Sequence, residues 1–148
     1  MVARLSGHDP VRVAGGLLYL DLTRNSGAAF GIATGATIIF SVVAAAVVVL
    51  IVRASSRLRS LGWAVAFGLI LGGACGNLTD RLVRGPGPLR GGVVDWISLF
   101  EPDGGAWPIF NLADAGIVCG GLLAVALMLL GIDVSGARLR GREEAGPP

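Results

Sequence analysis

Three long apolar stretches constrain the fold of this chain more than any other feature of its sequence. They cover residues 34–52, 61–78 and 115–132. The hydrocarbon core of a bilayer is about 30 Å thick, and a helix of about 20 apolar residues crosses it. We therefore predict three transmembrane helices over these ranges, within a single membrane domain that comprises residues 1–148.

The composition supports this prediction and excludes several classes of protein. Hydrophobic residues make up 53% of the chain and charged residues 15%, whereas soluble domains contain about 25% charged residues. The net charge of +2 is too small to indicate nucleic acid as a partner. Cys75, Cys119 and the single histidine, His8, do not form a metal-binding pattern, so we expect no metal and no cofactor. Both cysteines are expected to be buried between helices.

Two arginine clusters predict how the helices are oriented. They are Arg53, Arg57 and Arg59 between the first two spans, and Arg138, Arg140 and Arg142 after the third. Positive charge beside a span marks the cytoplasmic side. Two crossings lie between the clusters and return the chain to the same side, so both clusters indicate the same orientation. We expect residues 1–33 and 79–114 on the outer side, and a cytoplasmic tail over residues 133–148.

The predicted outer segments contain two stretches with the character of strands. "VVDWISLF" (93–100) is β-branched and aromatic, and "GLLYLDL" (16–22) alternates around Leu18, Leu20 and Leu22. The first stretch fits either a strand or an interfacial segment, and the second could form a strand beside it. Glycines in the second and third spans are expected to allow close helix packing: Gly68, Gly72, Gly73, Gly76, Gly120 and Gly121. Trp63, Trp96 and Trp107 have the positions of interfacial aromatic residues.

Two aspartates on the predicted outer side are the candidates for chemistry. Taken alone, Asp114 would cap the third span and Asp95 would be an exposed loop acid. Taken together, carboxylates at the membrane edge are costly and tend to be functional. Two carboxyl groups that lie close together share one proton, as in aspartic proteases. With a single histidine the chain offers no Ser–His or Cys–His set, so an aspartate pair is the hydrolytic arrangement it permits.

The remaining acids have simpler interpretations. Asp80 and Arg81 are expected to form an ion pair at the outer end of the second span. Asp9, Asp21 and Asp103 are interpreted as solvated acids.

Four segments resemble the lipoprotein signal peptidases (signal peptidase II). They are "TRNSGAAFGI", "GGACGNLTDRL", "GGVVDW" and "FNLADAGI", in the family's order, over about residues 17–132. The resemblance implies an integral membrane, mainly α-helical aspartic endopeptidase: a bundle of four spans in the family, three here, with a small β-rich cradle on its outer face. Such an enzyme removes signal peptides from diacylglyceryl-modified prolipoproteins by cutting before the lipidated cysteine.

The same resemblance implies roles for particular residues. Asp95 and Asp114 match the catalytic pair, and the residues that match supporting positions are Asn25, Asn77, Asp80, Arg81 and Asn111. The implied partners are a prolipoprotein substrate and membrane lipid. The protein is expected to be a monomer in the bacterial cell membrane, with its active site at the outer face.

The chain departs from the family pattern in two places. Trp96 stands where phenylalanine is usual, and the family's first transmembrane helix has no counterpart here. We expect the gene to continue in frame upstream of Met1 and to encode a further span of about 20 apolar residues. The alternatives to the protease are a truncated, inactive homologue and a non-catalytic membrane scaffold.

Overall fold

Three long helices and a small antiparallel sheet make up the residues that the computed structural model describes, 2–26, 37–85 and 87–138. In chain order the elements are α1 (Val2–Leu5), β1 (Val11–Val13), the 3-10 turn η1 (Ala14–Gly16), β2 (Leu18–Asn25), α2 (Thr37–Ser55), α3 (Leu61–Val83), β3 (Val93–Leu99), the 3-10 turn η3 (Pro102–Gly104) and α4 (Leu112–Leu129). The Gly-Ala-Ala-Phe part of the first motif, Arg140 and Arg142 lie outside the described residues.

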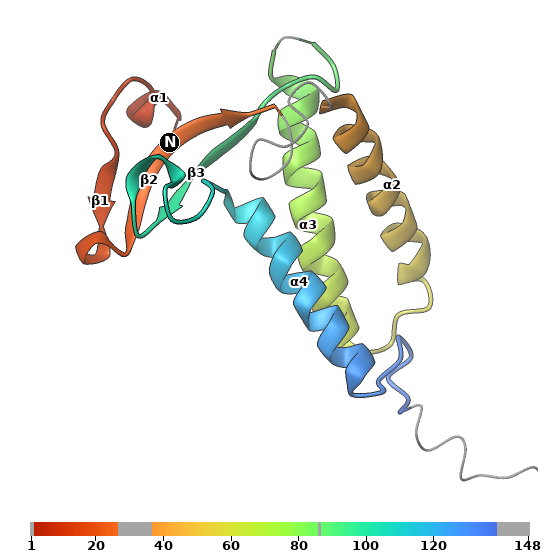
Figure 1. The fold of residues 1–148 in the computed structure, drawn as a ribbon. Coiled ribbons are helices and arrows are strands. Elements are labelled where there is room, and N and C mark those ends of the chain that lie inside the picture. Colours follow the sequence, from red (N-terminus) through yellow and green to blue (C-terminus); the bar gives the residue numbers. More distant parts are fainter. Residues whose placement is uncertain (1, 27–36, 86, 139–148) are drawn as a thin grey trace, which may run out of the picture.

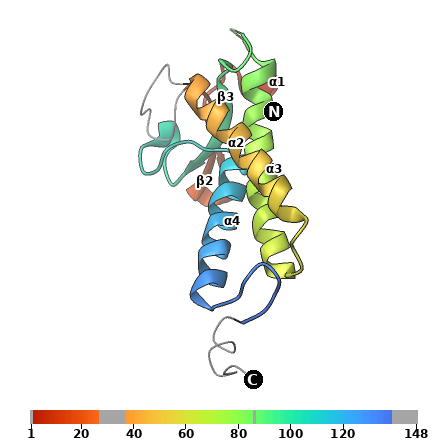
Figure 2. The same cartoon turned by 90° about the vertical axis from the view of Figure 1, so that its right-hand side faces the viewer.

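The sheet lies beside one end of the helices, where α3 ends and α4 begins (Figure 1). Helix α3 packs against both α4 and α2. In the perpendicular view the sheet again lies at that end, and the segment that follows α4 lies at the opposite end (Figure 2). The chain is therefore mainly helical with a small sheet at one end, as the sequence predicts.

The three predicted spans are confirmed as helices, with shifted ends. Within the described residues, α2, α3 and α4 are long and apolar enough to cross a membrane, and their outward surface is apolar. Helix α3 extends five residues beyond the predicted end at residue 78, and α4 begins at Leu112 rather than at residue 115. Asp114 therefore lies within the first turn of α4.

Glycines bring α3 and α4 into close contact. A Cβ added at Gly73 would lie 2.3 Å from the carbonyl oxygen of Ala113, and one at Gly120 would lie 2.7 Å from that of Ala66. Such contacts leave no room for a side chain, as expected for helices that pack in lipid. The prediction was wrong for Gly68, Gly72 and Gly121, where an added Cβ meets nothing within 4 Å.

The other end of the bundle joins the link after α2 to the segment after α4. The backbone amides of Arg59 and Ser60 donate to the carbonyl of Val134, at 3.0 and 3.1 Å. Trp63 donates from Nε1 to the carbonyl of Ile132 at 2.9 Å and is buried at this end of α3. Arg59 and the segment that leads to Arg138 thus lie at the same end of the helical bundle. This placement fits the prediction that both arginine clusters lie on one side of the membrane.

The two cysteines are exposed rather than buried, which corrects the prediction. Cys75 lies on α3 and Cys119 on α4. Successive residues of a helix point about 100° apart. Gly73, Ala74 and Gly120 occupy the buried face, so the neighbouring cysteines face outward.

A bulge in β2 determines which of its side chains face β3. The strands pair in antiparallel register with Leu20 opposite Ile97 and Thr23 opposite Asp95, so three steps along β2 match two along β3. An extra residue reverses the alternation of faces beyond it. As a result Thr23 and Asn25, rather than Leu22 and Arg24, share the face of Asp95.

Candidate active site

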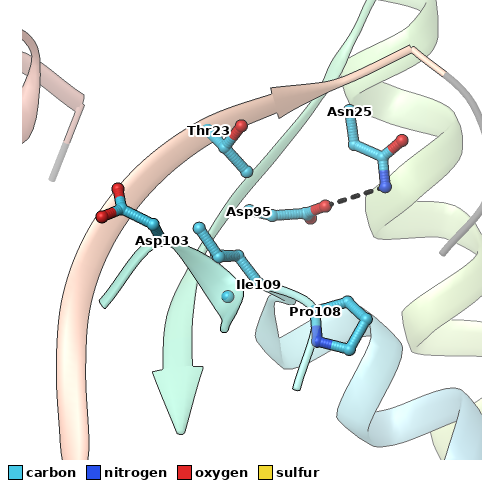
Figure 3. A pocket seen from close by; sticks show the side chains of 7 residues that line it. Thr23, Asn25, Asp95, Asp103, Pro108 and Ile109 are labelled. Carbon is cyan, nitrogen blue, oxygen red and sulfur yellow. Dashed lines mark hydrogen bonds between the residues drawn. The ribbon is translucent and has the colours of Figure 1, made fainter. Parts of the chain in front are cut away.

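Asp95 is a buried carboxylate in the middle of β3, with 1% of its surface exposed. Nδ2 of Asn25 donates to Oδ2 of Asp95 at 3.1 Å, and Nδ2 of Asn111 donates to Oδ1 at 2.6 Å. Figure 3 shows the carboxylate pointing toward Asn25. Burial raises the pKa of Asp95 to about 6, and the two amide donors oppose that shift. Asp95 therefore holds a proton more readily than a solvated aspartate does.

Asp114 is the third residue of α4 and belongs to a capping box. Asn111 is the N-cap, and its Oδ1 accepts the backbone amides of Ala113 and Asp114 at 2.7 and 3.1 Å. Oδ2 of Asp114 accepts the backbone amide of Asn111 at 3.1 Å in return. The interpretation of Asp114 as the N-cap is thus corrected: Asn111 is the N-cap, and Asp114 occupies the third position of the capping box. A carboxylate in the first turn complements the positive end of the helix.

A short bridge brings the start of α4 beside β3. The backbone amide of Phe110 donates to the carbonyl of Ile97 at 3.0 Å, and that of Ile97 donates back at 2.8 Å. The chain that leaves β3 thus returns alongside it just before α4 begins. This return places Asn111 next to Asp95.

Asn77, on α3, completes the connection between the two aspartates. Its Nδ2 donates to Oδ1 of Asp114 at 2.7 Å, and its Oδ1 accepts from Nδ2 of Asn111 at 3.2 Å. Both asparagines are buried. Two amide side chains therefore join the carboxylates of Asp95 and Asp114 through a continuous set of hydrogen bonds.

Arg81 lies buried next to this network. Its Nη1 is 3.4 Å from the carbonyl oxygen of Asn77, and the charges of Asp114 and Asp95 act on it. Within the described residues its Nε has no hydrogen-bond partner. The buried cation offsets part of the negative charge of the two aspartates.

Asp80 is paired differently from the prediction. Its Oδ1 forms an ion pair with Nε of Arg84 at 2.7 Å, and its Oδ2 accepts the backbone amide of Val94 at 3.0 Å. The predicted ion pair with Arg81 is wrong, because residues i and i+4 share a helix face and residues i and i+1 do not. Asp80 ties the end of α3 to β3 and lies outside the set of residues that surrounds the two carboxylates.

Three cavities reach this set of residues. One, of about 270 Å³, is lined by Asn77 and Asn111 together with Asp80, Arg84, Val94 and Trp96. The other two approach from different sides. The first has a volume of about 410 Å³ and is lined by Thr23, Asn25, Asp95, Asp103, Gly104, Pro108 and Ile109 (Figure 3). The second, of about 260 Å³, lies among α2, α3 and α4. It is lined by apolar side chains that include Phe40, Val43 and Ile117, and by Asn77 and Arg81.

Asp103 is the residue at the site that the sequence interpretation missed. It is exposed, as a solvated acid should be, but it also lines the same cavity as Asp95. The Pro-Asp-Gly sequence over residues 102–104 is a turn signal. That signal predicts a turn at these residues but not where the turn lies in space, because its place in the fold depends on the length and direction of β3.

The arrangement can support acid–base chemistry with two carboxyl groups. Asp95 is buried and has a raised pKa, while Asp114 lies at a helix N-terminus and accepts two hydrogen bonds. Paired carboxyl groups in different surroundings can serve as an acid and a base. Within the described part of the chain, no group of three or more His, Cys, Asp or Glu side chains could hold a metal ion.

Comparison with known proteins gives a consistent result. Residues 1–130 match the sequence profile of the family described as signal peptidase (SPase) II. The lipoprotein signal peptidase of Streptomyces coelicolor is 52% identical over 136 residues, which are 92% of this chain and 64% of that protein. The lipoprotein signal peptidase of Rhodococcus jostii is 48% identical over 137 residues, 93% of this chain and 67% of that protein.

A solved structure of a bacterial membrane enzyme has a similar fold. Its TM-score is 0.70 at 31% identity, over 82% of this chain and 71% of that one. The chain spans about two thirds of the length of the two curated relatives, 64% and 67%. By its sequence and its fold, this chain is a membrane protein that belongs to the signal peptidase II family.

Proposed function

We propose that this chain is a membrane aspartic endopeptidase that removes signal peptides from diacylglyceryl-modified prolipoproteins, cutting before the lipidated cysteine. The observation that carries the proposal is the pair of carboxylates, Asp95 and Asp114, joined through Asn77 and Asn111. Two curated relatives named lipoprotein signal peptidase support the choice of substrate.

The surroundings of the two aspartates suggest which one acts as the base and which one as the acid. Ionised Asp114 takes a proton from water, and the water oxygen attacks the carbonyl carbon before the cysteine. Protonated Asp95 donates its proton to the carbonyl oxygen, giving a tetrahedral intermediate. When the C–N bond breaks, Asp114 passes its proton to the leaving nitrogen, and Asp95 regains a proton from the intermediate. Both carboxyl groups return to their initial states.

The supporting residues hold this pair in position. Asn25 and Asn111 fix the two oxygens of Asp95, and Asn77 fixes Asp114. Arg81 keeps the charge of the buried pair low, and Asp80 fixes β3 against α3. Each of these residues acts by positioning an aspartate or by stabilising the helix or strand that carries it.

Two of the cavities suggest how a substrate lies. The apolar cavity among the helices suits the apolar signal segment or an acyl chain, which arrives from within the bilayer. The polar cavity at Asp95 suits the start of the mature chain. The sheet and the aspartates then lie at the outer face of a bacterial cell membrane and the C-terminus in the cytoplasm, with residues 1–148 as one membrane domain that acts as a monomer.

The test uses the purified chain in lipid nanodiscs. It is incubated with a diacylglyceryl-modified prolipoprotein and, separately, with the same protein lacking the lipid, and the products are identified by mass spectrometry. We expect a new N-terminus at the lipidated cysteine from the modified substrate alone. An intact substrate in the presence of folded protein would contradict the proposal and favour the inactive homologue or the scaffold.

A further inference from the structure

The cavity at Asp95 carries a second acidic side chain, Asp103, from a different part of the chain. Asp95 and Asp103 are the ionisable side chains among the residues that line this cavity. Figure 3 labels both, on β3 and on η3. Asp103 is exposed, whereas Asp95 is buried. The cavity wall therefore carries one solvent-facing carboxylate and one buried carboxylate.

Hydrogen bonds hold η3 against the sheet. The backbone amide of Asp103 donates to Oδ2 of Asp21 on β2 at 2.6 Å. The amide of Gly104 donates to Oγ of the buried Ser98 at 3.2 Å, and that hydroxyl donates to the carbonyl of Glu101 at 2.6 Å. Asp103 is thus fixed at the cavity rather than carried on an unattached loop.

The two ionisable side chains that line the cavity are both acidic. Asp21, which accepts the amide of Asp103, adds a further carboxylate beside the cavity. Among the described residues the one ion pair joins Arg84 to Asp80, so Asp103 has no ion-pair partner there. Residues 27–36, which follow β2 in the chain, contain no ionisable side chain. A hollow lined by charge of one sign attracts ligands of the opposite sign.

We propose that Asp103 is a specificity-determining residue that favours substrates with a basic side chain shortly after the lipidated cysteine and disfavours acidic ones. The inference rests on the proposed function, because it assigns the polar cavity to the start of the mature chain. Asp103 interacts with the bound peptide in the same way before and during the reaction. Its effect therefore appears in KM and leaves kcat nearly constant.

The test compares two lipopeptides that differ at the second residue after the lipidated cysteine, lysine in one and glutamate in the other. With the full chain in nanodiscs of uncharged lipid, we expect KM to be about three- to tenfold lower for the lysine peptide at low salt. The ratio of the two KM values should approach one as salt is added, because salt screens the exposed carboxylate of Asp103.

Asp103→Asn should bring the ratio of the two KM values close to one. Asparagine suits this position because Asp103 has a φ of 59°, a conformation that asparagine tolerates. The matched control is Asp9→Asn, which removes an exposed carboxylate that does not line the cavity and should preserve the ratio. Equal KM values in the unchanged chain, or a ratio that survives Asp103→Asn, would overturn the inference.

A binding measurement separates this inference from the proposed function. Fluorescence anisotropy with the same two lipopeptides reports the preference whether or not they are cut. If neither peptide is cleaved but the lysine peptide binds more tightly in an Asp103-dependent manner, the specificity stands and the peptidase proposal fails. If both peptides are cleaved with equal KM and bind equally, the peptidase proposal stands and the specificity inference fails.

Discussion

Asn77 and Asn111 are hydrogen-bonded to each other, and each also donates to one of the two aspartates. The distance from Nδ2 of Asn111 to Oδ1 of Asn77 is 3.2 Å. The same nitrogen of Asn111 donates to Asp95 at 2.6 Å, and Nδ2 of Asn77 donates to Asp114 at 2.7 Å. Neutral amides thus fix two acidic groups at the meeting point of α3, α4 and β3 without adding charge.

Substitutions of Asn111 should separate its structural role from its role at the carboxylates. Asn111→Ser keeps an oxygen that can cap α4 but cannot donate to both Asp95 and Asn77. We expect its thermal stability to stay near that of the unchanged chain while kcat falls by about 10²-fold. Asn111→Ala should also lose about 1 kcal/mol of stability, because the cap is gone. Thermal unfolding in detergent and a cleavage assay measure the two effects, and equal activity of the serine variant would contradict the assignment.

The pH dependence of cleavage should report the protonation of Asp95. With a pKa of about 6, Asp95 loses its proton above that pH, so kcat/KM should fall about tenfold per pH unit. Asn25 donates to the carboxylate and favours the ionised form. Asn25→Ala should therefore raise this pKa and move the alkaline limb of the profile to higher pH. Thr23→Val, at a neighbouring position of the cavity, is the control, and an unmoved limb in Asn25→Ala would argue against Asp95 as the acid.

Close packing of α3 on α4 should depend on particular glycines. Gly73→Ala places a methyl group against the carbonyl of Ala113, so we expect a loss of about 1–3 kcal/mol in the free energy of unfolding. Gly72→Ala, on the same helix, meets nothing within 4 Å and should be tolerated. Denaturation of both variants in detergent tests this difference. Similar stabilities would show that α3 and α4 pack otherwise.

Reagents directed at other mechanisms should leave cleavage unaffected. Chelators and serine-protease reagents should not inhibit, and Cys75→Ala and Cys119→Ala should cut normally because both cysteines lie on outward helix surfaces. Turnover of one lipopeptide, measured with and without each change, tests this. Strong inhibition by a chelator would count against a reaction carried by two aspartates.

Much of the fold could be predicted because long apolar runs and strand-like alternation are local signals. The spans and the pairing of β2 with β3 agree with the structure. The ends of the helices were less predictable. Asn111 and Asp114 both favour helix N-termini, and their order in the capping box decides which one is the cap.

Other features depend on tertiary contacts that no local pattern encodes. The bulge in β2 brings Asn25 to the face of Asp95, although strict alternation would place Arg24 there. Asp80, near the end of α3, pairs with Arg84, which follows the helix, and its other carboxylate oxygen accepts the amide of Val94 in β3. Asp103 joins the site through the path of the chain after β3. Polar residues such as these have several partners within reach, and the fold selects among them.

Cleavage by single aspartate variants tests the central claim most directly. Asp95→Asn, Asp114→Asn and the control Asp9→Asn are compared as purified proteins in nanodiscs, with thermal unfolding to establish that each is folded. We predict that turnover of a lipidated prolipoprotein falls by about 10²- to 10⁴-fold in each of the first two variants and is unchanged in the third. Near-normal turnover by folded Asp95→Asn or folded Asp114→Asn would contradict the account.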